Sequence, residues 1–108
     1  YKADALEIKP DRLELGKINQ DSVTIEQEII IFNNEKTQLQ IKKLRSSCDC
    51  IEIGLEHAVK LKPGQKFSIK IELIPSKLEK GKFRKYIFLE VIGSIKPVYV
   101  IEINGSIL

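Results

Sequence analysis

The segment Phe67-Ser68-Ile69-Lys70-Ile71-Glu72-Leu73 alternates apolar and polar residues without interruption. A period of two places every apolar side chain on one face of a β-strand and every polar side chain on the other. Pro75 follows the segment, and Pro63-Gly64 precedes it as a type II turn pair in which proline supplies φ and glycine a positive φ. This stretch therefore predicts a half-buried strand bounded by two breaks.

The same period of two recurs along the chain, and no segment has the i, i+3, i+4, i+7 pattern of an amphipathic helix. The best helical window, residues 76–80, is about one turn long. Four glutamates alternate with apolar residues and are expected on solvent-facing strand surfaces: Glu26, Glu28, Glu72 and Glu102. Residues 5–10 and 12–18 are expected to form two short strands or one broken strand. Further strands are expected at residues 23–32, 51–54, 58–61, 83–92 and 98–107, with another starting at 39. About seven to eight strands separated by regular turn signals are typical of an all-β sandwich.

Composition limits the class of protein. The chain has 108 residues, 43% of them hydrophobic and 31% charged, which favours one folded domain over residues 1–108 and excludes a disordered segment. No apolar run approaches the ~18 residues of a membrane-spanning helix. The sequence begins at Tyr1 and contains no methionine, so we expect a processed mature form or an excised domain, in which any signal peptide is already absent.

The charge pattern does not favour nucleic-acid binding. The net charge of +3 comes from 18 basic and 15 acidic residues that are interspersed along the chain. The two most basic stretches, Lys42-Lys43-Arg45 and Lys77-Lys80-Lys82-Arg84-Lys85, are short and interrupted by apolar or acidic neighbours, whereas nucleic-acid binding calls for a basic stripe with interleaved aromatic residues. We interpret them as strand lysines that discourage edge-to-edge aggregation.

A break in the alternation near residue 42 predicts a β-bulge. In a regular strand Leu39 and Ile41 would face one side and Leu44 the other. Lys42-Lys43 places two residues where regular alternation has one outward-facing residue, as a bulge does. Beyond the bulge, one face of a continuing strand would carry Leu44, Ser46, Cys48 and Cys50. The Cys-x-Cys motif is therefore expected at the end of a core-facing strand.

Seven short segments cover nearly the whole chain in a familiar order: Leu15-Gly16-Lys17-Ile18, Ile31-Phe32-Asn33-Asn34, Leu39-Gln40-Ile41, Ser46-Ser47-Cys48-Asp49-Cys50, Leu61-Lys62-Pro63-Gly64, Gly81-Lys82-Phe83 and Ile101-Glu102-Ile103-Asn104-Gly105. Together they resemble the bacterial domain of unknown function 1573, whose members are similar to the Hydin-type and major-sperm-protein-type immunoglobulin-like domains. The resemblance implies an immunoglobulin-like β-sandwich of mostly antiparallel strands. It also implies a non-enzymatic binding or assembly module with another protein as its partner, in a periplasmic, extracellular or other cell-envelope location.

The chain departs from the family pattern within the Cys-x-Cys motif. The family usually has glycine between the cysteines and threonine after them, where this chain has Asp49 and Ile51. A glycine there implies a positive φ, which aspartate tolerates better than most residues, so we expect a positive φ at Asp49. The missing threonine hydroxyl argues against a fixed catalytic arrangement.

The two cysteines allow three interpretations. The first is a pair of small buried side chains, because free cysteine packs as a compact hydrophobe. The second is a Cys48-Cys50 disulfide, which requires a bulge or a positive φ because Cα atoms two residues apart in a straight strand are ~6.6 Å apart. The third is a soft-metal site, such as one for Cu(I), with Cys48, Cys50 and His57 as ligands.

Enzymatic templates fit the sequence poorly. A Cys-His nucleophile pair needs the base within hydrogen-bond reach and an orienting third group, and Cys48 or Cys50 with His57 is the only pairing available. Phosphate-binding glycine loops and the common hydrolase motifs are absent from the sequence. We therefore expect no enzyme and no cofactor, and the competing hypothesis is a thiol site that binds copper or undergoes redox change.

Overall fold

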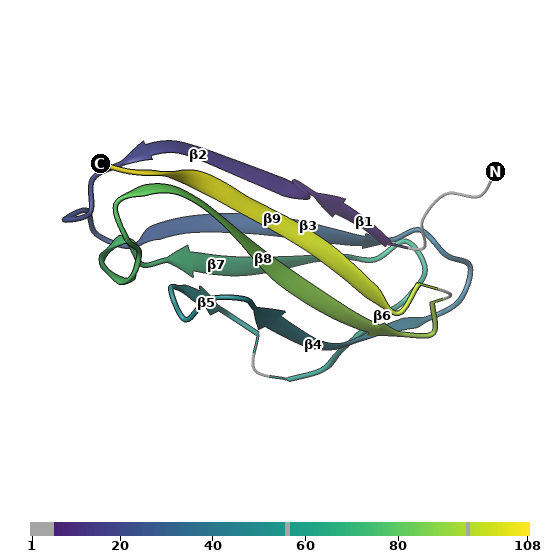
Figure 1. Cartoon of the computed structure of the whole chain (residues 1–108). Coiled ribbons are helices and arrows are strands. Elements are labelled where there is room, and N and C mark those ends of the chain that lie inside the picture. Colours follow the sequence, from purple (N-terminus) through teal and green to yellow (C-terminus); the bar gives the residue numbers. More distant parts are fainter. Residues whose placement is uncertain (1–5, 56, 95) are drawn as a thin grey trace.

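The computed structural model describes residues 6–55, 57–94 and 96–108, and these contain nine β-strands and one short 3-10 turn (Figure 1). The strands are β1 (Leu6–Lys9), β2 (Arg12–Ile18), β3 (Ile25–Asn33), β4 (Leu39–Ser46), β5 (Ile51–Ile53), β6 (Val59–Leu61), β7 (Lys66–Leu73), β8 (Gly81–Ile92) and β9 (Val98–Ile107), and the 3-10 turn η1 spans Pro75–Lys77. Each expected strand is present in the described residues, and Ala5, where the expected strand 5–10 begins, lies outside them. The number is nine instead of seven or eight because the segments on either side of Pro10 form separate strands.

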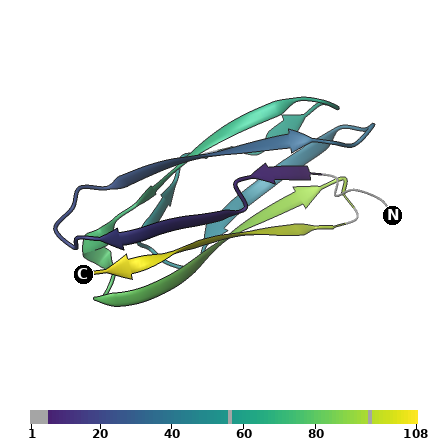
Figure 2. The same cartoon turned by 90° about the horizontal axis from the view of Figure 1, so that it is seen from above.

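The strands form two layers (Figure 2). Sheet A has the order β1-β3-β7-β5, and sheet B has the order β2-β9-β8-β4-β6. Every strand pair is antiparallel except β2 and β9, which run parallel. The chain therefore has the expected all-β, mostly antiparallel sandwich.

The chain changes sheets at Pro10. β1 pairs with β3 in sheet A, whereas β2 pairs with β9 in sheet B. Proline has no backbone N–H and cannot donate to a ladder, so Pro10 separates the two pairings. As a result β2 covers the edge of β9.

The core lies between the two sheets. On β7, Ile69, Ile71 and Leu73 are buried while Ser68 and Lys70 are exposed, as the alternation predicts. The four glutamates assigned to solvent-facing surfaces are exposed or half-buried. Glu72 lies directly across from Glu26 on one side and from Glu52 on the other, so sheet A carries a row of carboxylates on its outer face.

Two local predictions are confirmed by the backbone geometry. Ile41 pairs with Val91 and Lys43 with Glu90, so Lys42 is the extra residue of a β-bulge. In the turn after β6, the Gln65 N–H donates to the Lys62 carbonyl at 3.0 Å. Gly64 there has a φ of 78°, as position i+2 of a type II turn requires.

Asn33 is a fully buried polar residue at the end of β3, with 0% of its surface exposed. Its side-chain N–H groups donate to the carbonyls of Thr37 at 3.0 Å and Leu61 at 2.9 Å, and its Oδ1 accepts from the Glu35 N–H at 2.9 Å. Its backbone N–H donates to the Gln65 carbonyl. Asn33 thus joins the end of β3, the loop after it, β6 and the 62–65 turn.

Candidate functional site

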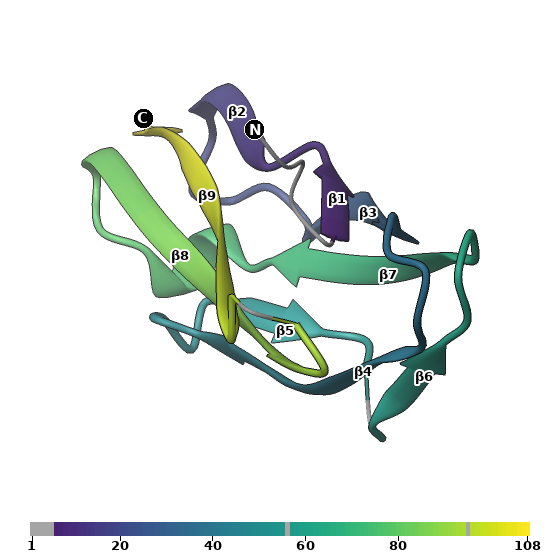
Figure 3. The same ribbon diagram turned by 90° about the vertical axis from the view of Figure 1, so that its right-hand side faces the viewer.

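The Cys-x-Cys motif lies in a turn between the two sheets. β4 ends at Ser46, and residues 47–50 form bends and a turn that lead to β5 in sheet A (Figure 3). The expectation that the strand continues through Cys50 in one register is wrong. The Ser46 hydroxyl donates to the Cys48 carbonyl at 2.6 Å, and the Ile51 N–H donates to the same carbonyl. These local bonds fold the chain back on itself, so it cannot continue the ladder with β8.

Cys48 and Cys50 are joined in the structure, with their sulfur atoms 2.01 Å apart and their Cα atoms 5.1 Å apart. The turn brings the Cα atoms closer than the ~6.6 Å of a straight strand. The expected positive φ at Asp49 is wrong, because no described residue other than glycine has one. The turn itself therefore shortens the distance, without a left-handed residue.

The two sulfur atoms differ in their surroundings. Cys50 is fully buried and Cys48 is half-buried. The Cys50 N–H donates to the Cys48 sulfur at 3.1 Å, and the Cys50 carbonyl accepts from the Ile74 N–H at 2.7 Å. The bond to Ile74 ties the turn to the segment that follows β7.

We propose that this pair is oxidised in the protein's own compartment, and thiol counting tests the proposal. Protein isolated without reductant and denatured in the presence of a thiol reagent is expected to react at neither cysteine. After reduction both cysteines of the sequence should react. Two reactive thiols before reduction would contradict the proposal.

The structure does not bring His57 to the two cysteines. His57 is exposed and lies before β6, in a small hollow of about 210 Å³ that it shares with Lys42, Lys43 and Ala58. Across the described ranges, no three His, Cys, Asp or Glu side chains are grouped so that they could hold a metal ion. The Cu(I) hypothesis remains a prediction of the sequence, and in this structure both thiols are used in the disulfide.

The turn leaves part of β8 without a neighbour. β4 pairs with β8 from Gln40 to Ser46, opposite Ile92 to Ile87. Ser47 adds one more contact, because its N–H donates to the Tyr86 carbonyl at 2.8 Å and its hydroxyl accepts from the Tyr86 N–H at 2.9 Å. Before Tyr86, the segment Gly81–Lys85 pairs with β9 alone among the residues that the structure describes. We call this segment the open edge of β8.

A hollow of about 580 Å³ lies against the open edge. Its lining comes from the Cys-x-Cys turn (residues 47–49), the end of η1 and the loop after it (residues 77–80), and the start of β8 (residues 82–85). Five of these side chains are basic and two are acidic: Lys77, Lys80, Lys82, Arg84 and Lys85 against Asp49 and Glu79. We call it the edge hollow.

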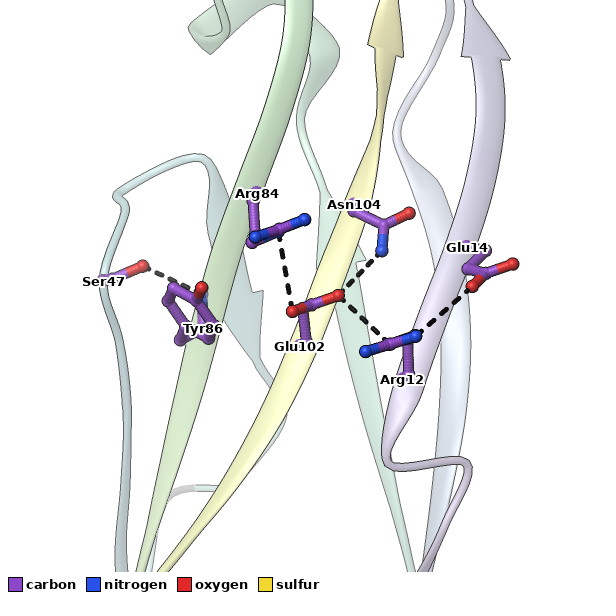
Figure 4. Close-up of polar contacts among 7 residues, drawn as sticks. All are labelled: Arg12, Glu14, Ser47, Arg84, Tyr86, Glu102 and Asn104. Carbon is purple, nitrogen blue, oxygen red and sulfur yellow. Dashed lines mark hydrogen bonds and ion pairs between the residues drawn. The ribbon is translucent and has the colours of Figure 1, made fainter.

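The outer face of sheet B beside the open edge carries a polar network centred on Glu102 (Figure 4). The Glu102 carboxylate lies 3.2 Å from Arg12 Nε and 3.6 Å from Arg84 Nε, and it accepts from Asn104 Nδ2 at 2.8 Å. Its side chain is 17% exposed. The guanidinium of Arg84 is therefore directed toward β9, and the lysines supply the remaining positive charge of the edge hollow.

Sequence reasoning found the cysteines but missed the open edge. The basic stretch 77–85 was interpreted as strand lysines that discourage edge-to-edge aggregation, and in the structure its five basic residues line one hollow. The available signal was the serine and aspartate content of residues 46–50, which favours a turn. If the motif ends β4, then β8, which pairs with β4, is expected to continue without a neighbour on that side.

A family model described as "Protein of unknown function (DUF1573)" matches residues 6–107. The chain belongs to this family, as the resemblance predicted. No curated protein matches it.

Three solved structures share the fold. A protein of unknown function from Porphyromonas gingivalis W83 has a TM-score of 0.81 at 16% identity, over 95% of this chain and 46% of that one. The human CEP192 ASH/PapD-like domain 7 has a TM-score of 0.72 at 11% identity, over 97% of this chain and 86% of that one. The periplasmic chaperone SfaE has a TM-score of 0.62 at 9% identity, over 94% of this chain and 56% of that one. This chain thus spans about half the length of the Porphyromonas and SfaE chains.

Proposed function

We propose that this chain is a non-enzymatic immunoglobulin-like module of a bacterial protein that binds or positions another protein through the open edge of β8. The observation that carries the proposal is that Gly81–Lys85, in the middle of sheet B, pairs among the described residues with β9 on one side and has no strand on the other. An unpaired strand edge exposes backbone donors and acceptors that can accept a strand from another chain.

The comparisons support a binding role. A PapD-like domain and a protein named as a periplasmic chaperone have the same fold. The edge hollow and the neighbouring hollow over Gly105 are both open to solvent. Open surfaces of this kind suit a macromolecular partner better than a small substrate, which usually binds in a concave, largely buried pocket.

We also propose an exported, periplasmic or cell-envelope location. Disulfides persist in oxidising compartments and are rare in the cytosol, so the Cys48–Cys50 bond supports this location. The described part of the chain contains no helix that is long and apolar enough to cross a membrane.

Site-specific photo-crosslinking in the source cells tests the proposal. A photoreactive amino acid in place of Lys82, which lines the edge hollow, is expected to form a discrete adduct with another protein. The matched control replaces Lys70, an exposed lysine on the outer face of sheet A, and is expected to give several-fold less of that adduct. Equal yields at both positions, or no adduct at position 82, would contradict the proposal.

A further inference from the structure

We propose that the open edge of β8 binds an extended acidic peptide segment of another protein, which adds to sheet B as a short strand. This inference rests on the proposed function and specifies the chemistry of the partner. The strand would occupy the line along β8 that β4 leaves at Ser46.

The backbone of the open edge is arranged for strand addition. The N–H and the carbonyl of Tyr86 both face the β4 side, because both bind Ser47. Successive residues of a strand direct these groups to alternate sides, so the groups of Arg84 and Lys82 also face away from β9. Within the described residues, none of these four groups has a hydrogen-bond partner. A peptide in extended conformation supplies complementary groups at the same spacing.

The edge hollow provides the space that an added strand needs. The Cys-x-Cys turn carries the chain away from β8 after Ser47, and Figure 4 shows Ser47 beside Tyr86 with Arg84 farther along β8. The open edge is five residues long, Gly81–Lys85, and a strand of that length spans about 17 Å. The hollow of about 580 Å³ lies directly against it.

The charges around the open edge select an acidic segment. Four lysines line the hollow and take part in no ion pair with another described residue: Lys77, Lys80, Lys82 and Lys85. Lysines on an exposed edge discourage pairing with neutral or basic strands, including a second copy of the same edge. An acidic strand instead gains from complementary charge, which raises its association rate and its specificity.

A peptide suits this surface better than a nucleic acid does. Single-stranded nucleic acids bind by stacking their bases on exposed aromatic rings. Phe83 is the aromatic residue in the lining of the edge hollow, and its ring is packed over Gly105, within 2.9 Å of the place that a Cβ there would take. The ring is thus half-buried and packed against Gly105, while the backbone groups of Lys82 and Arg84 are free to pair.

Fluorescence anisotropy with a defined probe tests the inference. The probe is a fluorescein-labelled peptide of about ten residues in which Glu alternates with Val and Thr, both strong strand formers. It is expected to bind saturably at low ionic strength and to weaken as salt screens the lysines. A control peptide with Lys in place of each Glu is expected to bind at least about tenfold more weakly.

Two pairs of variants distinguish the contribution of the backbone N–H groups to peptide binding from that of the side-chain charges. Arg84→Pro removes an N–H of the open edge without removing a bond to β9, and is expected to weaken acidic-peptide binding by about tenfold. Arg84→Gln keeps that N–H and is expected to weaken acidic-peptide binding less than Arg84→Pro does. Lys82→Glu should weaken binding by about tenfold, whereas Lys60→Glu, at an exposed position of β6 outside the hollow, should leave it unchanged. Unfolding curves check that each variant is folded.

If Arg84→Pro does not fold, Lys82→Pro removes the other open N–H. Amide shifts of the wild-type chain provide an independent readout, and are expected to move at Lys82 and Arg84 when the acidic peptide is added. Failure of the acidic peptide to bind, equal binding of both peptides, or equal effects of Arg84→Pro and Arg84→Gln would overturn the inference. Tighter binding of an oligothymidylate than of the acidic peptide would also overturn it. Crosslinking at position 82 without acidic-peptide binding would contradict this inference but would still support the proposed function.

Discussion

Replacing Asn33 with alanine is expected to lower the free energy of unfolding by about 3 kcal/mol, because buried polar groups that lose their partners cost about 1–3 kcal/mol each. The Asn33 side chain is the hydrogen-bond partner of the Thr37 carbonyl, the Leu61 carbonyl and the Glu35 N–H. Alanine binds none of these groups, and Asn33 is fully buried. Urea unfolding followed by circular dichroism measures the change.

The neighbouring residue provides the control for this prediction. Asn34 is exposed, so Asn34→Ala is expected to change stability by no more than about 0.5 kcal/mol. A loss below about 1 kcal/mol for Asn33→Ala would show that water or relaxation of the loop satisfies the three groups. The role of Asn33 in holding the loop after β3 against β6 would then be withdrawn.

Replacing Ile101 with alanine is expected to lower the free energy of unfolding by about 3–4 kcal/mol, within the range for large-to-small changes in a close-packed core. Ile101 is 0% exposed and lies at the centre of β9, opposite Ile87 of β8. The adjacent residue, Val100, points to the other side of the sheet and is 49% exposed. Val100→Ala should cost less than about 1 kcal/mol, since little buried volume is lost.

The two β9 variants together test the register of sheet B. A one-residue slip of β9 would exchange the buried and exposed faces of the strand. Equal losses for Ile101→Ala and Val100→Ala, measured by urea unfolding with unchanged m-values, would contradict the register described above. A much larger loss for Val100→Ala would show that the faces are reversed.

The Cys-x-Cys turn and the open edge of β8 have one structural cause. The chain must leave sheet B at Ser46 to form β5 in sheet A. The bonds of Ser46 and Ile51 to the Cys48 carbonyl hold the turn that makes this change. Because β8 continues beyond this point, its first residues lose their neighbour. The motif thus borders the proposed binding site, and its residues Cys48 and Asp49 form part of the wall.

Most of the strands and their inward faces could be predicted from local pattern. The alternation in 67–73 identified the buried face of β7, and the paired lysines at 42 and 43 located the bulge of β4. The Pro63-Gly64 pair identified its turn type. The buried face, the bulge and the turn type each depend on the preferences of a few neighbouring residues. They can therefore be predicted from a single sequence.

The candidate site could be predicted only in part. The cysteines were recognised as the reactive residues, but the strand was expected to run through them and Asp49 was expected to have a positive φ. The first expectation extended local parity, and the second extended the family's glycine, into a segment where contacts to Ile74 and the disulfide decide the path. Asn33 lies just beyond the expected strand 23–32, and its burial depends on β6 and the 62–65 turn.

Side-chain alternation and turn residues were enough to establish an all-β chain and to decide which residues face the core. The tertiary structure decided which strands are neighbours: the parallel pairing of β2 with β9, the change of sheet at Pro10 and the open edge of β8. The physical reason is the range of the interactions. A strand's inward face follows from its own residues, whereas its hydrogen-bond partners come from segments far away in the chain.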